Sequence, residues 1–468
     1  MSDPSRRRLP PVHSVLDWPG LASSIELRGR EATVRAVRLA LERARAAIER
    51  GEGPAVDVEG LGRSAAASLA AERPDLRPVL NATGILLNTG LGRAPLAAEA
   101  AEAVDRVVRG YCNLEFDLDR GERGDRTGGV EALLARLTGA EAAAVVNNNA
   151  AATILAIRAL AAGREVVVSR GQLVEIGGSF RLPEIIEASG ARLREVGTTN
   201  KTRLADYARA IGPETAALLR VHPSNYRVVG FTEEAPLAGL AALARERDLW
   251  MIDDIGSGAL APGIPPGVSG EPTAAEGIAA GADLVLFSGD KLLGGPQSGI
   301  LVGTREAIDP LRRDPLIRAL RVDKMTLAAL EATLRLALQP SRAAARIPLW
   351  ALLKVPIESL LERAARLAGA FRAELGLNAS VVESTAFLGG GSAPAESIPT
   401  AAVRVAPPFP APWPSEAAWA RALRLGDPAV VTRVQGGAVL LDLRAIAERD
   451  DPLLLAAARA ASSGTPIG

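Results

Sequence analysis

The chain has 468 residues and a mass of 48.5 kDa, which is enough for about three domains of roughly 150 residues each. Hydrophobic residues make up 48% and charged residues 23% of the sequence, values that are typical of a folded globular protein and exclude a disordered or fibrous one. Because the formal net charge is zero, the composition also excludes a protein that binds nucleic acid through an overall positive charge.

The small number of cysteines and histidines limits the cellular compartments and the metal sites that the chain could have. Cys112 is the single cysteine, and His13 and His222 are the two histidines, so neither an internal disulfide nor a cysteine–histidine zinc cluster can form. Residues 1–11 lack the apolar segment of a signal peptide, and no run of about 18 apolar residues occurs. These features predict a cytoplasmic protein with no membrane segment and no metal site.

The first 76 residues are expected to form a small helical domain. Apolar residues spaced three and four apart over residues 31–50, followed by Gly51, predict an amphipathic helix, and a second short helix follows. Residues 1–50 hold ten arginines and six acidic residues, whereas the whole chain is neutral. This local excess fits an RNA-binding surface or, equally, an ordinary solvated helix face.

Seven short apolar runs alternate with helical patterns in the middle of the chain, and they lie at residues 143–146, 165–168, 193–196, 216–221, 249–252, 284–287 and 299–302. Such runs are typical of strands that are buried on both faces of a mostly parallel sheet. The sequence therefore predicts an α/β fold with a seven-stranded, mostly parallel sheet in a large domain at residues 77–340. Residues 341–468 are expected to form a smaller α+β domain, with two strands between residues 429 and 443.

One lysine stands in a distinctive position. The chain has four lysines and 50 arginines, and Lys291 follows the run at residues 284–287 in the small-residue segment Ser288-Gly289-Asp290-Lys291. Ligands of open α/β sheets bind beyond the carboxyl ends of the strands, so we expect the Lys291 amine to face a site. A lysine there can form a Schiff base with pyridoxal 5′-phosphate. The alternative is a surface lysine in a glycine-rich loop.

Two further strand ends favour the same cofactor. Residues 249–252 lead into Asp253 and Asp254, and a carboxylate there can pair with a pyridinium nitrogen. Asp254 is the preferred candidate, and Asp253, which could instead cap the following turn, is the alternative. Residues 143–146 lead into an asparagine-rich start of a helix, at Asn148 and Asn149, that suits a phosphate group. A plain asparagine cap is the alternative there, and the sequence contains no nucleotide-binding glycine motif.

Several segments together resemble one enzyme family along nearly the whole chain. They lie at residues 9–13, 80–94, 145–152, 169–178, 197–200, 224–226, 230–232, 256–258, 288–296, 323–335 and 439–444. These segments resemble the bacterial L-seryl-tRNA(Sec) selenium transferases, also called selenocysteine synthases. The resemblance implies an aminotransferase-like enzyme of pyridoxal phosphate fold type I.

The resemblance also implies an activity and a set of site residues. The reaction converts L-seryl-tRNA(Sec) to L-selenocysteinyl-tRNA(Sec) with selenophosphate, through an aminoacrylyl-tRNA intermediate on the cofactor. In such an enzyme, the helical domain at residues 1–76 is expected to bind the tRNA. Lys291 and the neighbouring Asp290 are the expected catalytic residues. The expected cofactor-binding residues are Asn148, Asn149, Ala150, Asp254, Ser257, Ser288 and Lys291. The expected substrate-binding residues are Arg93, Arg126, Thr198, Thr199, Asn225, Arg318 and Arg321.

The remaining expectations concern assembly and competing functions. The resemblance implies a homo-oligomer, a ring of dimers, with sites built across the dimer interface. Arg318 and Arg321 are three residues apart on an expected helix, so both could bind one anion. We interpret His222 as a packed residue, because no acidic partner is evident. The competing hypotheses are a pyridoxal phosphate lyase or aldolase that acts on a free small amino acid or sugar acid, and an RNA-binding protein with an inactive catalytic domain.

Overall fold

The computed structural model describes residues 9–50, 57–71, 76–176, 180–265, 268 and 270–463. The chain divides into two compact units, Met1–Pro78 and Val79–Gly468, so the division lies two residues beyond the boundary that we expected near Leu76. Among the described residues, no helix combines the length and the apolar character needed to cross a membrane.

The first unit is a small helical bundle. Its helices are α1 (Val12–Leu16), α2 (Ala22–Arg28), α3 (Arg30–Glu49) and α4 (Val58–Ala71), with a 3₁₀ turn η2 (Pro19–Leu21). The apolar face of α3, which includes Val37 and Leu41, packs with Val15, Leu21 and Leu61 in one core. The opposite face of α3 exposes arginines, as the amphipathic pattern predicts.

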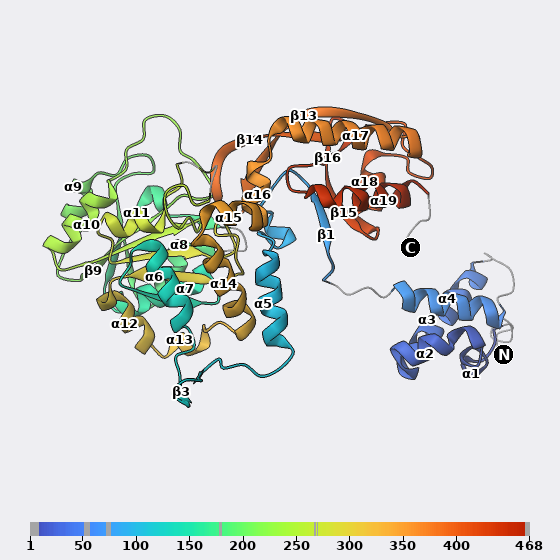
Figure 1. Cartoon of the computed structure of the whole chain (residues 1–468), viewed down its shortest axis with the longest axis horizontal. Coiled ribbons are helices and arrows are strands. Elements are labelled where there is room, and N and C mark those ends of the chain that lie inside the picture. Colours follow the sequence, from blue (N-terminus) through green and yellow to red (C-terminus); the bar gives the residue numbers. More distant parts are fainter. Residues whose placement is uncertain are drawn as a thin grey trace. The chain divides into compact units, whose positions relative to one another are not determined.

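The second unit is built on a seven-stranded sheet (Figure 1). Its strands, in spatial order, are β4 (Ala142–Val146), β12 (Gly299–Gly303), β11 (Leu284–Ser288), β10 (Trp250–Gly256), β9 (Thr215–Val221), β5 (Glu165–Ser169) and β8 (Arg192–Val196). Each predicted apolar run lies within one of these strands or overlaps it. Only β12 among them runs antiparallel to its neighbours, so the sheet is mostly parallel, as predicted.

Successive residues of these strands contribute to separate cores on the two faces of the sheet. Val285 and Phe287 of β11 belong to one core, and Leu284 and Leu286 belong to the other. Helices cover both faces: one layer includes α5 (Ala98–Val108), α6 (Gly128–Thr138), α10 (Leu237–Glu246) and α14 (Lys324–Ala337), and the other includes α7 (Asn149–Ala161), α8 (Leu182–Ala188) and α12 (Arg305–Arg313). Burial on both faces explains why the strands appear in the sequence as continuous apolar runs.

The shorter elements complete the large sheet's surroundings. They are β2 (Phe116–Asp117), β3 (Glu122–Arg123), β6 (Glu175–Ile176), β7 (Phe180–Arg181), α9 (Leu204–Ala210), α11 (Ala274–Ala279), α13 (Leu316–Ala319), α15 (Pro340–Arg346), α16 (Pro348–Lys354) and the 3₁₀ turns η3 (Thr89–Leu91) and η4 (Arg170–Gln172).

A second, five-stranded sheet lies in the C-terminal part of this unit, in the order β1-β15-β16-β14-β13. Its strands are β1 (Val79–Ala82), β13 (Asn378–Gly389), β14 (Ser392–Ala406), β15 (Ala429–Gln435) and β16 (Ala438–Asp442), and it packs with α17 (Ile357–Leu375), α18 (Glu416–Leu425) and α19 (Asp451–Ser462), which follows the 3₁₀ turn η5 (Glu448–Asp450). We expected residues 79–82 in the large domain, and the structure pairs β1 in parallel with β15 of this smaller sheet.

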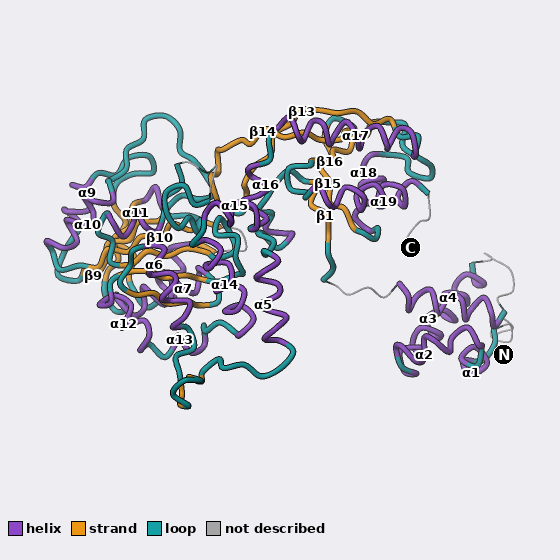
Figure 2. The backbone as a smooth tube through the Cα atoms, in the orientation of Figure 1, coloured by secondary structure: helices purple, strands orange, loops and turns teal. Residues whose placement is uncertain are grey.

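The β13–β14 hairpin, the longest among the residues that the structure describes, joins the two sheets (Figure 2). Its tip is formed by Gly389, Gly390 and Gly391, all with positive φ. Backbone hydrogen bonds hold the tip against the segment after β1: the Leu86 and Leu87 amides donate to the carbonyls of Phe387 and Leu388 at 3.0 and 2.7 Å. The small C-terminal sheet therefore reaches the large sheet through this tip.

Candidate active site

The carboxyl ends of the parallel strands meet at one edge of the large sheet. Lys291 follows β11, Asp254 lies near the end of β10, and Asn148 follows β4. These strands belong to one sheet and run in the same direction, so their ends place the three residues at the same edge. This edge is where open α/β sheets bind their ligands.

The Lys291 amine is held in a buried turn. Lys291 is 4% exposed, and its turn is fixed by the Leu292 amide, which donates to the Ser257 carbonyl at 2.9 Å. Burial lowers the pKa of the Lys291 amine, and the positive charge of Arg93 lowers it further, against the attraction of Asp254 and Asp290. An amine of lowered pKa is uncharged at a lower pH than an exposed lysine, which suits it to attack a carbonyl group.

The two neighbouring aspartates face opposite sides of β10. Asp254 Oδ1 accepts hydrogen bonds from Asn149 Nδ2 at 2.9 Å and the Gly256 amide at 3.1 Å, and Oδ2 accepts from Thr153 Oγ1 at 3.0 Å. Burial raises the pKa of Asp254. Asp253 instead pairs with Arg220, at 2.7 Å between Oδ1 and Nε, and burial raises its pKa to about 6. Since successive side chains of a strand point to opposite faces, only Asp254 contacts the helix that begins beside the strand ends.

The start of α7 supplies the features of a phosphate site. Asn148 caps the helix, since its Oδ1 accepts a hydrogen bond from the Ala151 amide at 2.9 Å, and Asn149 and Ala150 form the first turn. The amides of this turn point out of the helix and carry its positive partial charge. Within the described residues, the buried atoms Asn149 Oδ1 and Ser257 Oγ have no hydrogen-bond partner.

These observations fit the pyridoxal phosphate that the sequence predicts. Buried polar atoms are normally paired, so the two unsatisfied atoms beside Asp254 and the Lys291 turn suit a polar ligand. Each carboxylate oxygen can accept two hydrogen bonds, so Asp254 Oδ2, which accepts one from Thr153 Oγ1, can also accept one from a ring nitrogen. Ser288, at the end of β11, is buried at the same edge.

Arg93 is brought to Lys291 by the adjacent aspartate. Its Nη1 lies 2.8 Å from Asp290 Oδ2, and the Ala94 amide donates to the Asp290 carbonyl at 3.3 Å. Arg93 adopts a left-handed backbone conformation, with φ of 61°, which is uncommon for a residue with a side chain. The structure thus brings Arg93 and Asp290 together beside Lys291.

Replacing Arg93 by methionine is expected to move the reactivity of Lys291 to higher pH. Loss of the arginine charge, and release of the Asp290 carboxylate, both raise the pKa of the lysine amine. The measurement is the pH dependence of imine formation between the protein and added pyridoxal phosphate, followed by visible absorption. Arg109→Met is the control, because Arg109 pairs with Asp105 in an exposed ion pair. An unchanged midpoint in Arg93→Met would contradict the assignment.

The other three predicted arginines gather elsewhere, at the edge strand β4. A cavity of about 410 Å³ is lined by Arg126, Arg318 and Arg321, together with Glu115 and Arg312. The Glu115 Oε1 atom lies 3.0 Å from Arg126 Nε and 3.4 Å from Arg321 Nη1. Neither Arg93 nor Lys291 is among the residues that line this cavity. Within the described residues, the four arginines therefore form two groups.

The helix that we expected to carry both Arg318 and Arg321 is shorter than predicted. Helix α13 ends at Ala319, and Arg321 forms a bridge with Val146 at the end of β4. The Asn147 amide donates to the Leu320 carbonyl at 2.9 Å, so pairing with the sheet ends the helix. The two arginines still line one cavity, but from different local structures.

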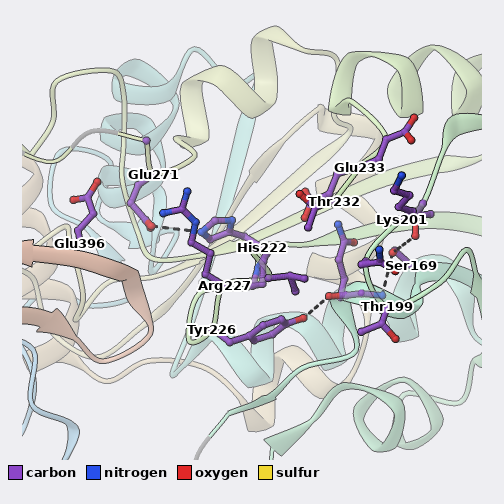
Figure 3. Close-up of a pocket in the computed structure, with 18 residues that line it drawn as sticks. Ser169, Thr199, Lys201, His222, Tyr226, Arg227, Thr232, Glu233, Glu271 and Glu396 are labelled. Carbon is purple, nitrogen blue, oxygen red and sulfur yellow. Dashed lines mark hydrogen bonds and ion pairs between the residues drawn. The ribbon is translucent and has the colours of Figure 1, made fainter. Parts of the chain in front are cut away.

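The three smaller polar candidates lie near a second cavity, of about 440 Å³ (Figure 3). Thr199 lines it. Thr198 does not line it, and its Oγ1 donates to the Lys201 carbonyl at 3.0 Å within the adjacent turn. Asn225 is also outside the lining, and its Nδ2 donates to the Glu175 carbonyl at 2.8 Å. The structure thus places one of the three in the cavity and the other two beside it.

Two residues of this region, Glu271 and Ser224, were not predicted as part of a site. His222 Nε2 lies 3.5 Å from Glu271 Oε1, and both residues line the 440 Å³ cavity (Figure 3). We interpreted His222 as having no acidic partner, which was wrong, since the fold supplies one from 49 positions later. Ser224 is buried, and the Gly391 position lies beside its Oγ and the Lys291 amine. No local sequence pattern predicts the contact between His222 and Glu271 or the position of Gly391 beside Ser224.

Comparisons with known proteins identify the family to which the chain is similar. Residues 79–447 match the family described as L-seryl-tRNA selenium transferase, and residues 6–45 match the selenocysteine synthase N terminal family. Two relatives named L-seryl-tRNA(Sec) selenium transferase come from Solidesulfovibrio magneticus, 49% identical over 98% of both chains, and Geobacter sulfurreducens, 45% identical over 97% of this chain and 99% of the relative.

One solved structure has a fold similar to that of this chain. It is that of a D-glucosaminate-6-phosphate ammonia-lyase, with a TM-score of 0.58 and 23% identity, covering 83% of this chain and 96% of that chain. At this identity the likeness concerns the fold alone, and it confirms the predicted α/β fold. The two family matches and the full-length relatives show that the chain belongs to the L-seryl-tRNA selenium transferase family.

Proposed function

We propose that the protein converts L-seryl-tRNA(Sec) to L-selenocysteinyl-tRNA(Sec) in selenocysteine biosynthesis, with selenophosphate as the selenium donor and pyridoxal 5′-phosphate as the cofactor. The observation that carries the proposal is the buried Lys291 amine at the same sheet edge as the buried Asp254, in a chain that matches this family along nearly its whole length. Charged tRNA is a cytoplasmic substrate, so we also propose a cytoplasmic location.

The residues described above would contact different parts of the cofactor. The start of α7, with Asn148, Asn149 and Ala150, would bind its phosphate, and Asp254 would hold a proton on its ring nitrogen. Ser257 and Ser288 are buried at the same edge and would contact its polar groups. When bound, pyridoxal phosphate supplies a carbonyl group that condenses with amines and a ring that stabilises negative charge on the substrate's α-carbon.

Lys291 would move protons once the substrate's amino group has taken its place. Its Nζ, with a lowered pKa, can accept the proton from the α-carbon of the serine and deliver a proton to the departing hydroxyl oxygen. Asp290, paired with Arg93 at 2.8 Å, is held beside this amine and would steady its charge between the two steps. The low exposure of Lys291 would keep bulk water from competing for these protons.

Arginine side chains would bind the anionic selenium donor. Arginine suits a phosphate-like anion because its planar guanidinium can donate two parallel hydrogen bonds. We propose Arg93 as a donor-binding residue within the chain, and the group formed by Arg126, Arg318 and Arg321 as one that serves the site of another copy. This would require a homo-oligomer, which we propose is a ring of dimers with sites across the dimer interface. Thr198, Thr199 and Asn225 would add polar contacts to the substrate.

The alternative is a pyridoxal phosphate lyase or aldolase that acts on a free small amino acid or sugar acid. Its support is a likeness in fold to an ammonia-lyase at 23% identity, which says nothing about the substrate. Relatives with 44–56% identity, several of them over nearly the full chain, are named selenium transferases, and they favour the tRNA-linked reaction.

The experiment that tests this function uses the purified full-length protein loaded with pyridoxal phosphate. We expect a visible imine band that borohydride removes, that seryl-tRNA(Sec) perturbs, and that accompanies selenocysteinyl-tRNA formation when selenophosphate is added. A band that responds to free serine but not to the charged tRNA would overturn the transferase in favour of the lyase. Absence of any band would overturn the cofactor assignment.

Removal of residues 1–78 is expected to abolish binding of seryl-tRNA(Sec) and to leave the imine band unchanged. These residues form a separate compact unit, and the exposed face of α3 carries Arg35, Arg38 and Arg43, which can contact phosphates. Binding would be measured by a mobility shift, and the band by absorption of the shortened protein. A triple Arg35/Arg38/Arg43→Ala variant tests the surface without deletion. Undiminished tRNA binding by both proteins would contradict the assigned role.

A further inference from the structure

The tip of the β13–β14 hairpin is placed beside the Lys291 amine. A β-carbon added at Gly391 would lie 3.2 Å from Ser224 Oγ and 3.4 Å from Lys291 Nζ. The hairpin tip, 100 residues after Lys291 in the sequence, therefore borders the reactive atom. Gly391 has φ of 76°, a conformation that residues with side chains rarely adopt.

The other two glycines of the tip have a different task. A β-carbon at Gly389 would lie 2.3 Å from Ile85 Cγ2, and one at Gly390 would lie 2.7 Å from the Leu87 carbonyl oxygen. Both glycines therefore allow the tip to dock closely on residues 85–87. With the tip docked in this way, its position beside the amine is fixed by the backbone and not by the side chain of any one residue.

A second glycine faces the same two atoms from the large sheet. A β-carbon at Gly256, at the end of β10, would lie 3.5 Å from Ser224 Oγ and 4.0 Å from Lys291 Nζ. Gly256 is buried, whereas Gly391 is partly exposed. The amine and the hydroxyl thus lie between two residues without side chains, and the side toward Gly391 is the one that borders solvent.

We propose that Gly391 is a specificity-determining residue, whose bare α-carbon keeps open the approach that the substrate's amino group takes to the Lys291 position. This proposal rests on the proposed function, in that it assumes a substrate that enters as a primary amine attached to a large tRNA. A side chain at position 391 would fill the space over Nζ and Ser224 Oγ without touching Asp254 or the start of α7. The cofactor would still bind, and the incoming amine would be hindered.

The test compares Gly391→Ala with Gly436→Ala in the full-length, cofactor-loaded protein. Gly436 lies in the β15–β16 turn with φ of 57°, and a β-carbon there meets nothing within 4 Å, so the control carries similar backbone strain in open space. The readout is the rate at which hydroxylamine and the larger O-benzylhydroxylamine discharge the imine band. These probes require neither tRNA nor selenium.

We expect Gly391→Ala to keep the imine band and to react with O-benzylhydroxylamine about tenfold or more slowly than Gly436→Ala, with a smaller effect on hydroxylamine. A merely structural role would slow both probes alike or neither, and either result would overturn the proposal. Gly391→Asn and Gly436→Asn form a second pair, because asparagine tolerates left-handed backbone better than alanine does. Loss of the band in both Gly391 variants would place the residue in cofactor binding and would also overturn the proposal.

The outcome is separable from that of the proposed function. If the wild-type protein forms the imine band but does not convert seryl-tRNA(Sec), the transferase proposal fails, while the comparison of the two hydroxylamines still decides the role of Gly391. If the transferase activity is present and Gly391→Ala behaves as Gly436→Ala does, only the inference about the tip fails.

Discussion

Replacing Lys291 by alanine is expected to reduce selenocysteinyl-tRNA formation by roughly 10²–10⁴-fold, the usual contribution of a proton-transferring side chain. The variant loses both the amine that forms the imine with the cofactor and the group that moves the substrate's protons. The visible band of the internal imine should disappear, and borohydride should no longer attach the cofactor covalently to the chain. Activity would be measured by chromatography of the aminoacyl group after release from tRNA.

Lys354→Ala is the matched control for this experiment. Lys354 is exposed at the end of α16, so its loss should leave the band and the activity unchanged. Added methylamine provides a second check, because a small external amine can partly replace a missing lysine in proton transfer. A Lys291→Ala protein that keeps a borohydride-sensitive band would show that another lysine forms the imine.

Replacing Asp254 by asparagine is expected to lower the activity by roughly 10²–10³-fold, as the loss of one well-placed electrostatic partner does in other enzymes. The amide cannot hold a proton on the ring nitrogen through a negative charge, so charge on the α-carbon is less well stabilised. The carboxamide keeps the size of the side chain, so the contacts with Asn149 and Thr153 can largely persist. Single-turnover kinetics with seryl-tRNA(Sec) would separate this effect from a loss of tRNA binding.

Asp253→Asn is the matched comparison for Asp254→Asn, because it tests which of the two aspartates pairs with the ring nitrogen. Asp253 is buried against Arg220, so its loss weakens a charged hydrogen bond and should lower the free energy of unfolding by about 1.5–3 kcal/mol. The imine band and the rate per cofactor-loaded molecule should change little. The two variants are thus expected to show opposite profiles, one in activity and the other in stability. If Asp253→Asn were the variant that lost activity, the assignment of the ring partner would pass to Asp253.

The large sheet was predictable because its strands are buried on both faces. Residues such as Val285 and Leu286 belong to different cores, so the strand appears as an unbroken apolar run between polar segments. Lys291 and Asp254 follow two of these runs, and parallel strands such as β10 and β11 have their carboxyl ends at the same edge of the sheet. Local chemistry and topology were therefore sufficient for this part of the site.

The contacts between distant segments were not predictable in this way. Residues 378–406 form the β13–β14 hairpin, but their glycine, serine and proline content gives little strand signal. Glu271 reaches His222 only through the tertiary fold. Arg321 leaves the helix pattern because its backbone pairs with Val146, an interaction that local spacing does not encode.

The pairing of β1 with β15 has a consequence for the order in which the enzyme matures during its synthesis. Val79 pairs with Ala429, which the ribosome adds 350 residues later, an interval of roughly 20–70 s at ordinary bacterial elongation rates. During this interval the large sheet can form, because its last strand ends at Gly303, while β1 waits as an unpaired strand. The hairpin tip beside Lys291 is also made after the large sheet. A nascent chain released before residue 429 would thus carry an unpaired strand edge. We expect chaperones to bind such a chain and proteases to cleave it.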